Sequence, residues 1–369
     1  MKKVKVLIDL YYYKAAVSGI RSYISELKKS IDDHGSDQIQ YFFSHDINKL
    51  SFNNTYLNSS NRFIRWVFQL KYLVYKQIVL PIKIFVYKPD YLICSDYIAP
   101  IISFNTKKIT VIHDSLFWDY PENYKFLWRK YFISLVNLGI DSKAQIITTS
   151  MYSKNNLIRI FFNKTNKINY IYQTFTYFKT KEIDFQTPEK FILHVGSFEK
   201  RKDLLTLLKA FHLLKEDNLK LVLAGAQIFH GDDRVIKKIK RYIEKNKLYD
   251  KVILPGFISK ERAAVFYKRA SLYVFPSLDE GFGIPILEAF SFSIPVICSD
   301  IPVFREIGKN SVTYFKAGDP NSLVNKIKLV LYSNDLRKKL VNIGKEHLKK
   351  FNRKNFIKGF EEIILNNQN

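Results

Sequence analysis

Two glutamates, Glu280 and Glu288, stand eight positions apart in the stretch DEGFGIPILEAF. Gly281 and Gly283 lie between them, and glycines let a backbone bring several N–H groups close to a ligand. Pro285 is typical of the first turn of a helix, whose positive end attracts anions. A carboxylate near such a helix start can accept two hydroxyl hydrogen bonds from a diol. Taken alone, the stretch also fits an ordinary glycine turn with one solvated and one capping glutamate.

A second segment, VGSFEKRKDLL, combines a strand end with positive charge. Lys200, Arg201 and Lys202 precede a predicted helix that begins near Asp203. Cations beside a helix start form a diphosphate site, because charge-assisted hydrogen bonds are the strong ones. The alternative interpretation is a solvated basic loop, which is common in a chain this basic.

A third segment, TVIHDSLF, places His113 and Asp114 directly after a buried strand. Acid–base chemistry or contact with a polyol is the functional interpretation, and a hydrogen-bonded loop histidine is the alternative. Gly19 follows the first strand and would let an acceptor or phosphate approach closely, or form a plain turn. No HxxxH, HExxH or CxxC spacing occurs, so we predict no metal site.

These segments need strands and helices to position them. An apolar strand at 4–10, a loop and helical spacing from Ile20 to Ile31 are the opening of a parallel α/β sheet. The same rhythm restarts after a polar stretch at 179–190, with five strand-like runs separated by helical patterns. We therefore predict two Rossmann-like domains in series and a C-terminal amphipathic helix, at residues 1–180, 181–345 and 346–369.

Composition limits the class of protein. The chain has 369 residues, enough for two domains, and 47% are hydrophobic, as in globular proteins. Its formal net charge of +25 favours anionic partners such as phosphates or acidic lipid surfaces. Cys94 and Cys298 are far apart in apolar contexts, which favours a reducing compartment. The N-terminal apolar run is too short for a signal peptide, and no apolar stretch is long enough to span a membrane.

The motifs together resemble a known family. EGFGIPILE carries the E-x7-E element of the family 4 retaining glycosyltransferases, and the match continues to Glu306. HVGSFEKRKDLLTLLKAF and VILPGFISKERAAVFYKRASLYVFPS match the preceding units of the same domain. SGIRSYISEL, VIHDSLFWDYPENY and IITTSMYSKNNL resemble the branch that includes many mannosyltransferases. The resemblance implies the GT-B fold, in which an acceptor domain and a nucleotide-sugar domain face each other across a cleft and the C-terminal helix packs back on the first.

The resemblance also implies roles for matched residues. Glu288 would hold the ribose hydroxyls of a nucleotide-sugar, and Glu280 would contact the donor sugar. Arg201 and Lys202 would neutralise the departing diphosphate, and His113 would lie beside the transferred sugar. These last four would be the catalytic set. Further donor contacts would come from Gly19, Gly196, Ser197, Phe257, Ile258, Gly281, Phe282, Gly283 and Ile284.

One position departs from the family pattern. Many relatives carry arginine where this chain has Ser197, and Arg201 is the candidate substitute. We expect no metal and no other cofactor, since fixed cations and amides would stabilise the developing charge. Retention of configuration without a clear protein nucleophile suggests attack on the same face through an oxocarbenium-like state.

Residues 47–89 contain no acidic side chain but seven basic and nine aromatic ones. Arg62, Gln69, Lys76 and Lys83 recur every seven positions and would form one polar stripe on a helix, with Pro81 breaking or kinking it. Such a helix, at 62–88, would lie on an anionic membrane surface. The alternative is a core helix with snorkelling lysines. A nucleic-acid partner is not expected, because the Arg-rich spacing it would need is absent.

The expected function is transfer of a sugar, mannose favoured and GDP-mannose the favoured donor, to a lipid-linked or glycan acceptor. By family analogy the acceptor belongs to surface polysaccharide biosynthesis such as O-antigen or lipopolysaccharide synthesis. The expected place is the inner face of the cytoplasmic membrane. A nucleotide-sugar epimerase or hydrolase of the same fold, and a non-catalytic membrane or polyanion binder, are the alternatives.

Overall fold

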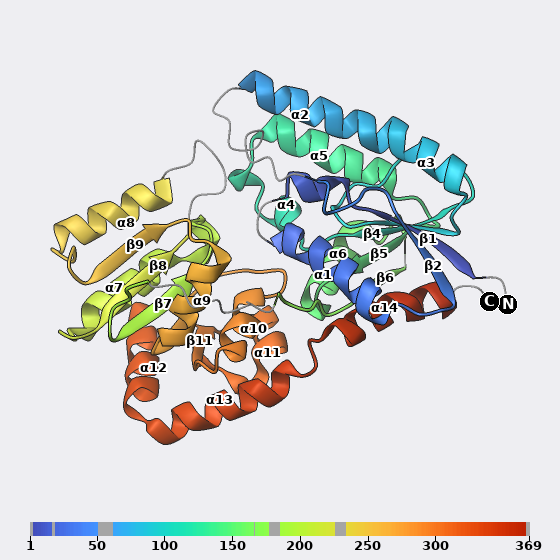
Figure 1. Cartoon of the computed structure of the whole chain (residues 1–369). Coiled ribbons are helices and arrows are strands. Elements are labelled where there is room, and N and C mark those ends of the chain that lie inside the picture. Colours follow the sequence, from blue (N-terminus) through green and yellow to red (C-terminus); the bar gives the residue numbers. More distant parts are fainter. Residues whose placement is uncertain are drawn as a thin grey trace. The chain divides into compact units, whose positions relative to one another are not determined.

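The computed structural model describes residues 3–16, 19–50, 62–165, 167–176, 185–225 and 234–366. The chain forms two compact units. The first unit comprises Met1–Thr174 together with Phe351–Asn369, and the second comprises Phe175–Lys350. Both are built on a parallel sheet with helices on its two faces, which confirms the predicted pair of Rossmann-like domains (Figure 1).

The first unit is built on a parallel sheet in the order β2-β1-β3-β4-β5-β6. Its strand order reverses between β1 and β3, where a doubly wound sheet has its switch point. The strands are β1 (Val4–Asp9), β2 (Ile39–Phe43), β3 (Tyr91–Cys94), β4 (Lys107–Val111), β5 (Gln145–Thr148) and β6 (Ile168–Tyr170).

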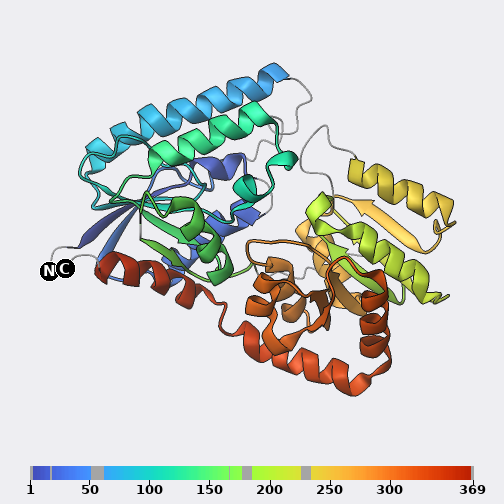
Figure 2. The same cartoon turned by 180° about the vertical axis from the view of Figure 1, so that it is seen from behind.

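Helices cover both faces of this sheet because alternate strand residues point to opposite sides. Leu7 belongs to one core cluster, whereas Val6 and Ile8 of the same strand belong to the other. On the first face lie α2 (Arg62–Val74), α3 (Leu80–Tyr87), α5 (Phe126–Gly139) and α6 (Met151–Phe161). Figures 1 and 2 both show α2 and α5 side by side there. The short α4 (Leu116–Asp119) follows β4.

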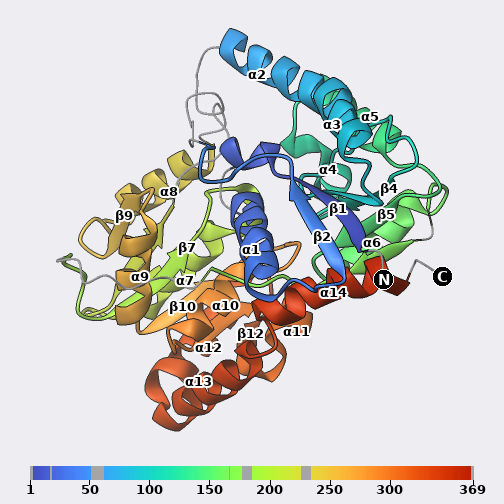
Figure 3. The same cartoon turned by 45° about the vertical axis from the view of Figure 1, so that its right-hand side comes forward.

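The other face of the first sheet is covered by α1 (Gly19–His34) and α14 (Arg353–Asn366). Phe356 and Phe360 of α14 are buried in that core, and Arg353 pairs with the buried Glu26 of α1 at 2.9 Å. Figure 3 shows the red α14 against the blue α1. The prediction that the C-terminal helix packs back on the first domain is therefore confirmed.

The second unit repeats the design with the order β12-β11-β10-β7-β8-β9. The strands are β7 (Phe191–Val195), β8 (Lys220–Ala224), β9 (Val252–Gly256), β10 (Leu272–Phe275), β11 (Val296–Ser299) and β12 (Thr313–Phe315). Pro255 lies in β9, an edge strand, where a missing N–H leaves no neighbour unpaired. The order reverses between β7 and β10, which places the switch point of this unit there.

The core of the second unit fills both faces of the sheet. One cluster joins α7 (Leu204–Leu214), α8 (Arg234–Lys245), α12 (Pro320–Tyr332) and α13 (Asn334–Leu348) to one face. On the opposite face Phe266 of α9 (Lys260–Arg269) packs on Phe191 of β7, with ring centroids 6.0 Å apart. The helices α10 (Ile284–Ser291) and α11 (Pro302–Gly308) follow β10 and β11.

Residues 62–87 form one continuous helix that changes register in its middle. A π-helical turn, Tyr75–Val79, joins α2 to α3, and Pro81 stands in the first turn of α3. Pro81 was predicted to break or kink the helix, and it does not break it. The chain instead forms a wider turn just before Pro81, which relieves the clash between the proline ring and the preceding carbonyls. Among the described residues no helix is long and apolar enough to cross a membrane.

The predicted polar stripe on this helix needs a correction. The prediction that Lys76 lies on the surface is wrong, since its side chain is 1% exposed and paired with Asp9 and Asp96. Lys83 donates to the backbone oxygen of Ser44. The side chains of Arg62 and Arg65, and residues 51–61, lie outside the described part. The periodicity placed Gln69, Lys76 and Lys83 on one face, but Lys76 points inward because Asp9 and Asp96, which follow or end distant strands, attract it.

Candidate functional site

The predicted donor residues of the second unit gather around its switch point. Gly196 and Ser197 directly follow β7, and the loop from Ser277 to Glu280 follows β10. These two strands are neighbours in the sheet, so both loops lie at its carboxyl edge. Ligands of doubly wound sheets bind at this place.

A buried ion cluster joins the two loops. The Arg201 guanidinium contacts one carboxylate oxygen of Glu280 at 2.6 Å, and the Lys202 ammonium contacts the other. Ser277 donates to Glu280 at 2.8 Å. The backbone holds the same geometry, since Leu278 N–H donates to the Arg201 carbonyl at 2.7 Å. Sequence analysis predicted these three charged residues, but not that they bind one another.

The cluster is balanced in charge. Glu199 accepts from Arg201 Nε at 2.9 Å and from the Ser197 hydroxyl, so two carboxylates face two cations. Burial raises the pKa of Glu280, but Arg201 and Lys202 outweigh it and hold that pKa at about 2. Burial lowers the pKa of Lys202, and Glu280 only partly offsets this. The cations are therefore fixed in position before any ligand is present.

The loop that follows Glu280 needs glycine at one position. Gly283 has φ +115° and is the N-cap of α10, a conformation that residues with a Cβ rarely adopt. A Cβ there would stand 3.2 Å from the Phe304 ring. Pro285 occupies the first turn, as predicted. Gly281, Phe282 and Ile284 are part of the same turn into α10.

A further glycine was missed by sequence analysis. Gly225 follows β8 with φ +146°, and a Cβ on it would stand 1.7 Å from the Gly196 carbonyl oxygen. The carboxyl ends of β7 and β8 can approach only because this position lacks a side chain. The motif LKLVLAG contains the signal, a glycine directly after a strand, but its spacing alone does not indicate a close approach.

Glu288 lies on α10 in a different environment from Glu280. Its carboxylate accepts a hydrogen bond from Tyr267 of α9 at 2.9 Å. Burial raises its pKa to about 7, and Tyr267 and Lys260 only partly oppose this. Tyr267 is itself buried and stacks on Phe292, with centroids 5.4 Å apart. Nothing in the sequence around Tyr267 indicates this partnership.

Two more predicted donor residues lie at the same edge of the sheet. Phe257 and Ile258 follow β9, after Gly256 with φ +71°. The Phe257 ring is 77% exposed, so it is available for stacking on a flat ligand such as a base.

The other two predicted residues, Gly19 and His113, belong to the first unit. Gly19 begins α1, and a Cβ there would meet open space. His113 follows β4 and donates from Nε2 to the Ser95 carbonyl at 2.9 Å, because a carbonyl can only accept. Burial lowers its pKa to about 4, so the ring is neutral with a lone pair on Nδ1. Tyr23 of α1 packs on it at 4.7 Å.

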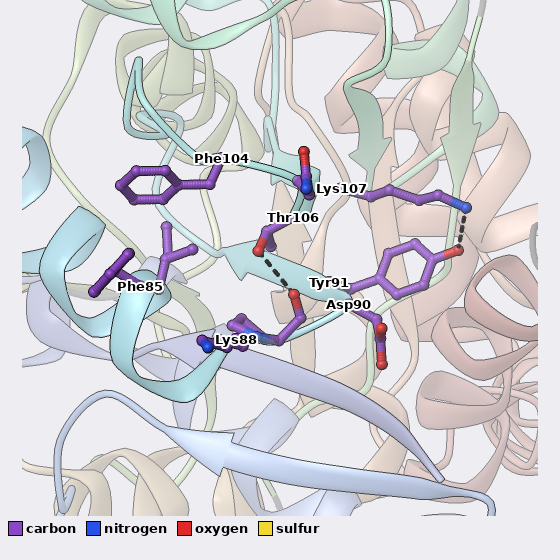
Figure 4. Close-up of a pocket in the computed structure, with 10 residues that line it drawn as sticks. Phe85, Lys88, Asp90, Tyr91, Phe104, Thr106 and Lys107 are labelled. Atoms are coloured by element: carbon purple, nitrogen blue, oxygen red, sulfur yellow. Dashed lines mark hydrogen bonds between the residues drawn. The ribbon is translucent and has the colours of Figure 1, made fainter. Parts of the chain in front are cut away.

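A cavity of about 670 Å³ lies in the first unit, and none of the predicted site residues lines it. It opens where α3 ends and where β3 and β4 begin, at the amino edge of the first sheet. Figure 4 shows Phe85 and Phe104 on one side and Lys88 and Lys107 among its other lining residues. Lys107 Nζ lies 3.5 Å from the Tyr91 hydroxyl.

The second unit also corresponds to a known family. Residues 177–347 match the glycosyl transferases group 1. The second unit belongs to this family. This confirms the resemblance found in the sequence, and the glycosyltransferase domain carries Arg201, Lys202, Glu280 and Glu288.

Relatives extend the comparison. An O-antigen chain mannosyltransferase of Salmonella typhimurium is 28% identical over 217 residues, covering 59% of this chain and 59% of the relative. O-antigen chain mannosyltransferase B of Escherichia coli is 26% identical over 214 residues, covering 54% and 55%. The chain thus spans somewhat more than half the length of these relatives. Sucrose-phosphate synthase of Thermosynechococcus elongatus shares the fold, with a TM-score of 0.68 and 18% identity over 99% of each chain.

Proposed function

We propose that this glycosyltransferase moves a hexose, mannose favoured, from a nucleoside-diphosphate sugar to a lipid-linked or glycan acceptor of a surface polysaccharide. The observation that carries the proposal is the buried Arg201–Lys202–Glu280 cluster at the switch point of a unit that matches the glycosyl transferases group 1, with Glu288 on the helix that follows. The names of the two mannosyltransferase relatives support mannose, with GDP-mannose as the donor.

The cluster suits the leaving group of this reaction. When the bond between the sugar and the diphosphate breaks, its electron pair stays on the diphosphate, which gains negative charge. Arg201 and Lys202 supply fixed positive charge for the diphosphate oxygen that is released from the sugar. Their carboxylate partners hold the two cationic side chains in place, so these need not move during the reaction. Glu280 is then within reach of the sugar attached to the same diphosphate. We propose that this chain stabilises the charge without a metal and that the product retains its configuration.

Glu288 suits the ribose of the same donor. Its Oε2 accepts a hydrogen bond from the Tyr267 hydroxyl at 2.9 Å. An ionised carboxylate accepts several hydrogen bonds, so it can hold the two hydroxyls of a ribose as well. Phe257, which follows β9 at the same carboxyl edge of the sheet, would stack on the base.

The donor assignment is tested by thermal shift with a panel of nucleotide-sugars, because a bound donor stabilises the folded state by mass action. We expect GDP-mannose to raise the melting temperature most. Glu288→Ala should abolish the shift, and Glu244→Ala, an exposed carboxylate on α8 of the same unit, should preserve it. An unchanged shift with Glu288→Ala would overturn the ribose assignment.

The reaction is tested by following the sugar. Radiolabelled mannose should appear in a lipid-extractable or glycan product only when an acceptor is present. Consumption of donor without acceptor would instead indicate a hydrolase or epimerase. Turnover should survive excess EDTA, and its loss would contradict the metal-free proposal. An NMR assignment of the product anomer decides retention.

We further propose that the first unit lies on an anionic membrane surface at the cytoplasmic side. The outward face of the continuous helix 62–87 is apolar, with large side chains exposed at spacings of three or four: Phe63, Trp66, Leu70, Val74, Ile78, Ile82 and Phe85. On α5, Phe126 and Leu127 are also exposed. Lys88 and Lys107 at the cavity of Figure 4 supply positive charge for lipid phosphates.

Vesicle flotation tests the membrane proposal. The double variant Ile82→Ser and Phe85→Ser should lose binding to phosphatidylglycerol vesicles, since their side chains are 57% and 62% exposed. Tyr249→Ser in the second unit, 62% exposed, is the control that should still float. Equal flotation of the double variant and the wild type would overturn the proposal.

A further inference from the structure

The switch point of the first sheet is occupied by a side chain of the chain itself. Lys76, from the π-helical turn of the helix 62–87, contacts Asp9 at 2.5 Å and Asp96 at 2.6 Å. Asp9 ends β1 and Asp96 comes two residues after β3, and these strands flank the switch point. We call Asp9, Lys76 and Asp96 the buried triad. It lies where a ligand would enter most doubly wound sheets.

The triad is fully enclosed. The exposed fractions are 2% for Asp9, 1% for Lys76 and 5% for Asp96. Tyr75 donates to Asp9 at 2.9 Å, and Tyr72 donates to Asp96 at 2.8 Å. Burial lowers the pKa of Lys76, but the two carboxylates outweigh it, so Lys76 is charged. The helix is thereby fastened to both strand ends by ionic hydrogen bonds.

The two residues next to Asp96, Ser95 and Tyr97, both contact His113 or its neighbour, and His113 is the candidate catalytic residue of the first unit. The Ser95 carbonyl accepts from His113 Nε2 at 2.9 Å, which fixes the tautomer of the ring. The Tyr97 hydroxyl donates to Asp114 at 3.1 Å, and its ring lies 5.5 Å from His113. Tyr97 has φ +70°, a conformation that needs support from its surroundings. Asp96 is the residue between these two contacts.

Attachment of the helix 62–87 to the sheet would not by itself require a buried ionic triad. Apolar side chains of similar volume hold a helix to a sheet as well as a buried ion pair does, and often better. The triad also coincides with a π-helical turn, a feature frequent at functional sites. Both observations indicate that the geometry of the Ser95–Tyr97 segment matters more than the strength of the attachment.

We propose that Lys76 is a positioning residue for His113, which it holds in place through Asp96 and the Ser95–Tyr97 segment. The proposal rests on the proposed function and on the role that the family resemblance implies for His113, beside the transferred sugar. Lys76 touches neither substrate nor reacting atoms. It keeps the Ser95 carbonyl where it accepts from His113 Nε2, so that the lone pair on Nδ1 faces away from Ser95.

The test uses the double variant Lys76→Met and Asp96→Asn in the full chain. Wild type and double variant both carry a net charge of −1 in the triad. In the double variant Asp9 keeps its hydrogen bonds from Tyr75 and Ser44 but loses its cation. Asp96→Asn alone is the second variant, in case the first does not fold. Lys71→Met, an exposed lysine on the same helix, is the matched control. Circular dichroism and thermal shift with GDP-mannose establish that the fold and donor binding are intact.

The deciding measurement is the NMR titration of His113, whose signal is assigned by its absence in His113→Gln. Tyr23 from α1, Tyr97 and the Ser95 carbonyl from the segment after β3, and its neighbour Asp114 surround the ring. When this segment is released the ring should become less enclosed, which raises its pKa by more than the loss of the Ser95 carbonyl lowers it. The pKa of His113 should therefore rise by about one unit. The value for kcat should fall about 10–100-fold with an unchanged donor KM.

The outcomes separate the two proposals. An unchanged His113 titration in both folded variants would overturn the positioning role, whatever the kinetics. A changed titration with unchanged kcat would overturn it as well, because His113 would then move without consequence. If the wild type transfers no sugar from any donor, the proposed function fails, and the titration alone still decides whether Lys76 positions His113.

Discussion

At the scale of single residues, the two glutamates of one short stretch meet opposite electrostatic conditions. Glu280 lies between two cations, whereas Glu288 has a tyrosine hydroxyl as its partner. The pKa of Glu280 is held at about 2, and that of Glu288 is raised to about 7 by burial. Near neutral pH, therefore, Glu288 is the glutamate whose charge depends on pH.

Donor binding should follow this titration. Ribose hydroxyls donate to the ionised form of Glu288, so the dissociation constant of a nucleotide-sugar should rise about tenfold between pH 8 and pH 6. The diphosphate of a nucleotide-sugar does not titrate in this range, which makes it a better probe than a free nucleoside diphosphate. Calorimetry across this range measures the effect. Persistence of the same pH dependence in Glu288→Gln would contradict the assignment.

The same shift predicts an effect on stability. The pKa of Glu288 is raised in the folded state, so its contribution is favourable below the unfolded pKa of 4.5 and is lost as pH rises through 7. Glu288→Gln should therefore raise the melting temperature of the ligand-free protein at pH 8, by about 2–4 °C. The difference should disappear near pH 4. An equal gain at both pH values would mean that charge is not the cause.

The sequence predicted these residues but not their pairing. The E-x7-E spacing and the basic segment identified Glu280, Glu288, Arg201 and Lys202 individually. The contacts of Glu280 with the two cations join positions that are 78 or 79 apart, and no local pattern contains that distance. Tyr267 was missed for the same reason, since its role depends on the packing of α9 against α10.

At the scale of elements, a turn that needs glycine at position 283 directs the start of α10 towards the switch point. Gly283 adopts φ +115° at the N-cap of that helix. Gly318, in the loop before α12, adopts φ +74°, but a Cβ there would meet open space. Gly283 and Gly318 both have a positive φ, but only Gly283 begins α10. Alanine variants at the two positions can therefore be compared as a test and its control.

Gly283→Ala should destabilise the second unit by about 1–2 kcal/mol and weaken nucleotide-sugar binding about tenfold. Gly318→Ala should cost similar stability and leave binding unchanged. Thermal melts and calorimetry measure both quantities. Equal loss of affinity in the two variants would show that general destabilisation, and not the helix start, is responsible.

The helices and strands could be predicted from the sequence, but the direction in which one helix points its polar side chains could not. The strands and helices, the parallel order and the crossover of α14 follow from periodicity and family resemblance. The helix 62–87 was predicted with its polar stripe outward. Periodicity reports which residues share a face, but the inward direction of Lys76 was set by Asp9 and Asp96, which are 67 and 20 positions away.

At the scale of the whole molecule, the first unit is made from two separate parts of the chain. The helix α14 fills one face of its sheet with Phe356, Ile357, Phe360 and Ile364, all of them at most 1% exposed. Glu361 accepts from the Tyr41 hydroxyl at 2.7 Å and from the Ser36 N–H at 2.6 Å. The helix is thus part of the core of the first unit.

Phe360→Ala should lower the free energy of unfolding of the first unit by about 3–5 kcal/mol, because it leaves a cavity in the core. Hydrogen exchange resolved by peptides should show faster exchange in β1, β3 and α1 and unchanged exchange in the second unit. Phe162→Ala, 68% exposed in the same unit, is the control. Uniform acceleration in both units would contradict the division.

This chain order has a consequence for synthesis. The ribosome makes α14 after the whole second unit, so the nascent first sheet waits without the helix that covers β1 and β3. At ordinary elongation rates the delay is roughly ten to thirty-five seconds. Throughout it, the part of this face that α1 leaves uncovered is an apolar surface, which a nascent-chain chaperone would hold until α14 has left the ribosome.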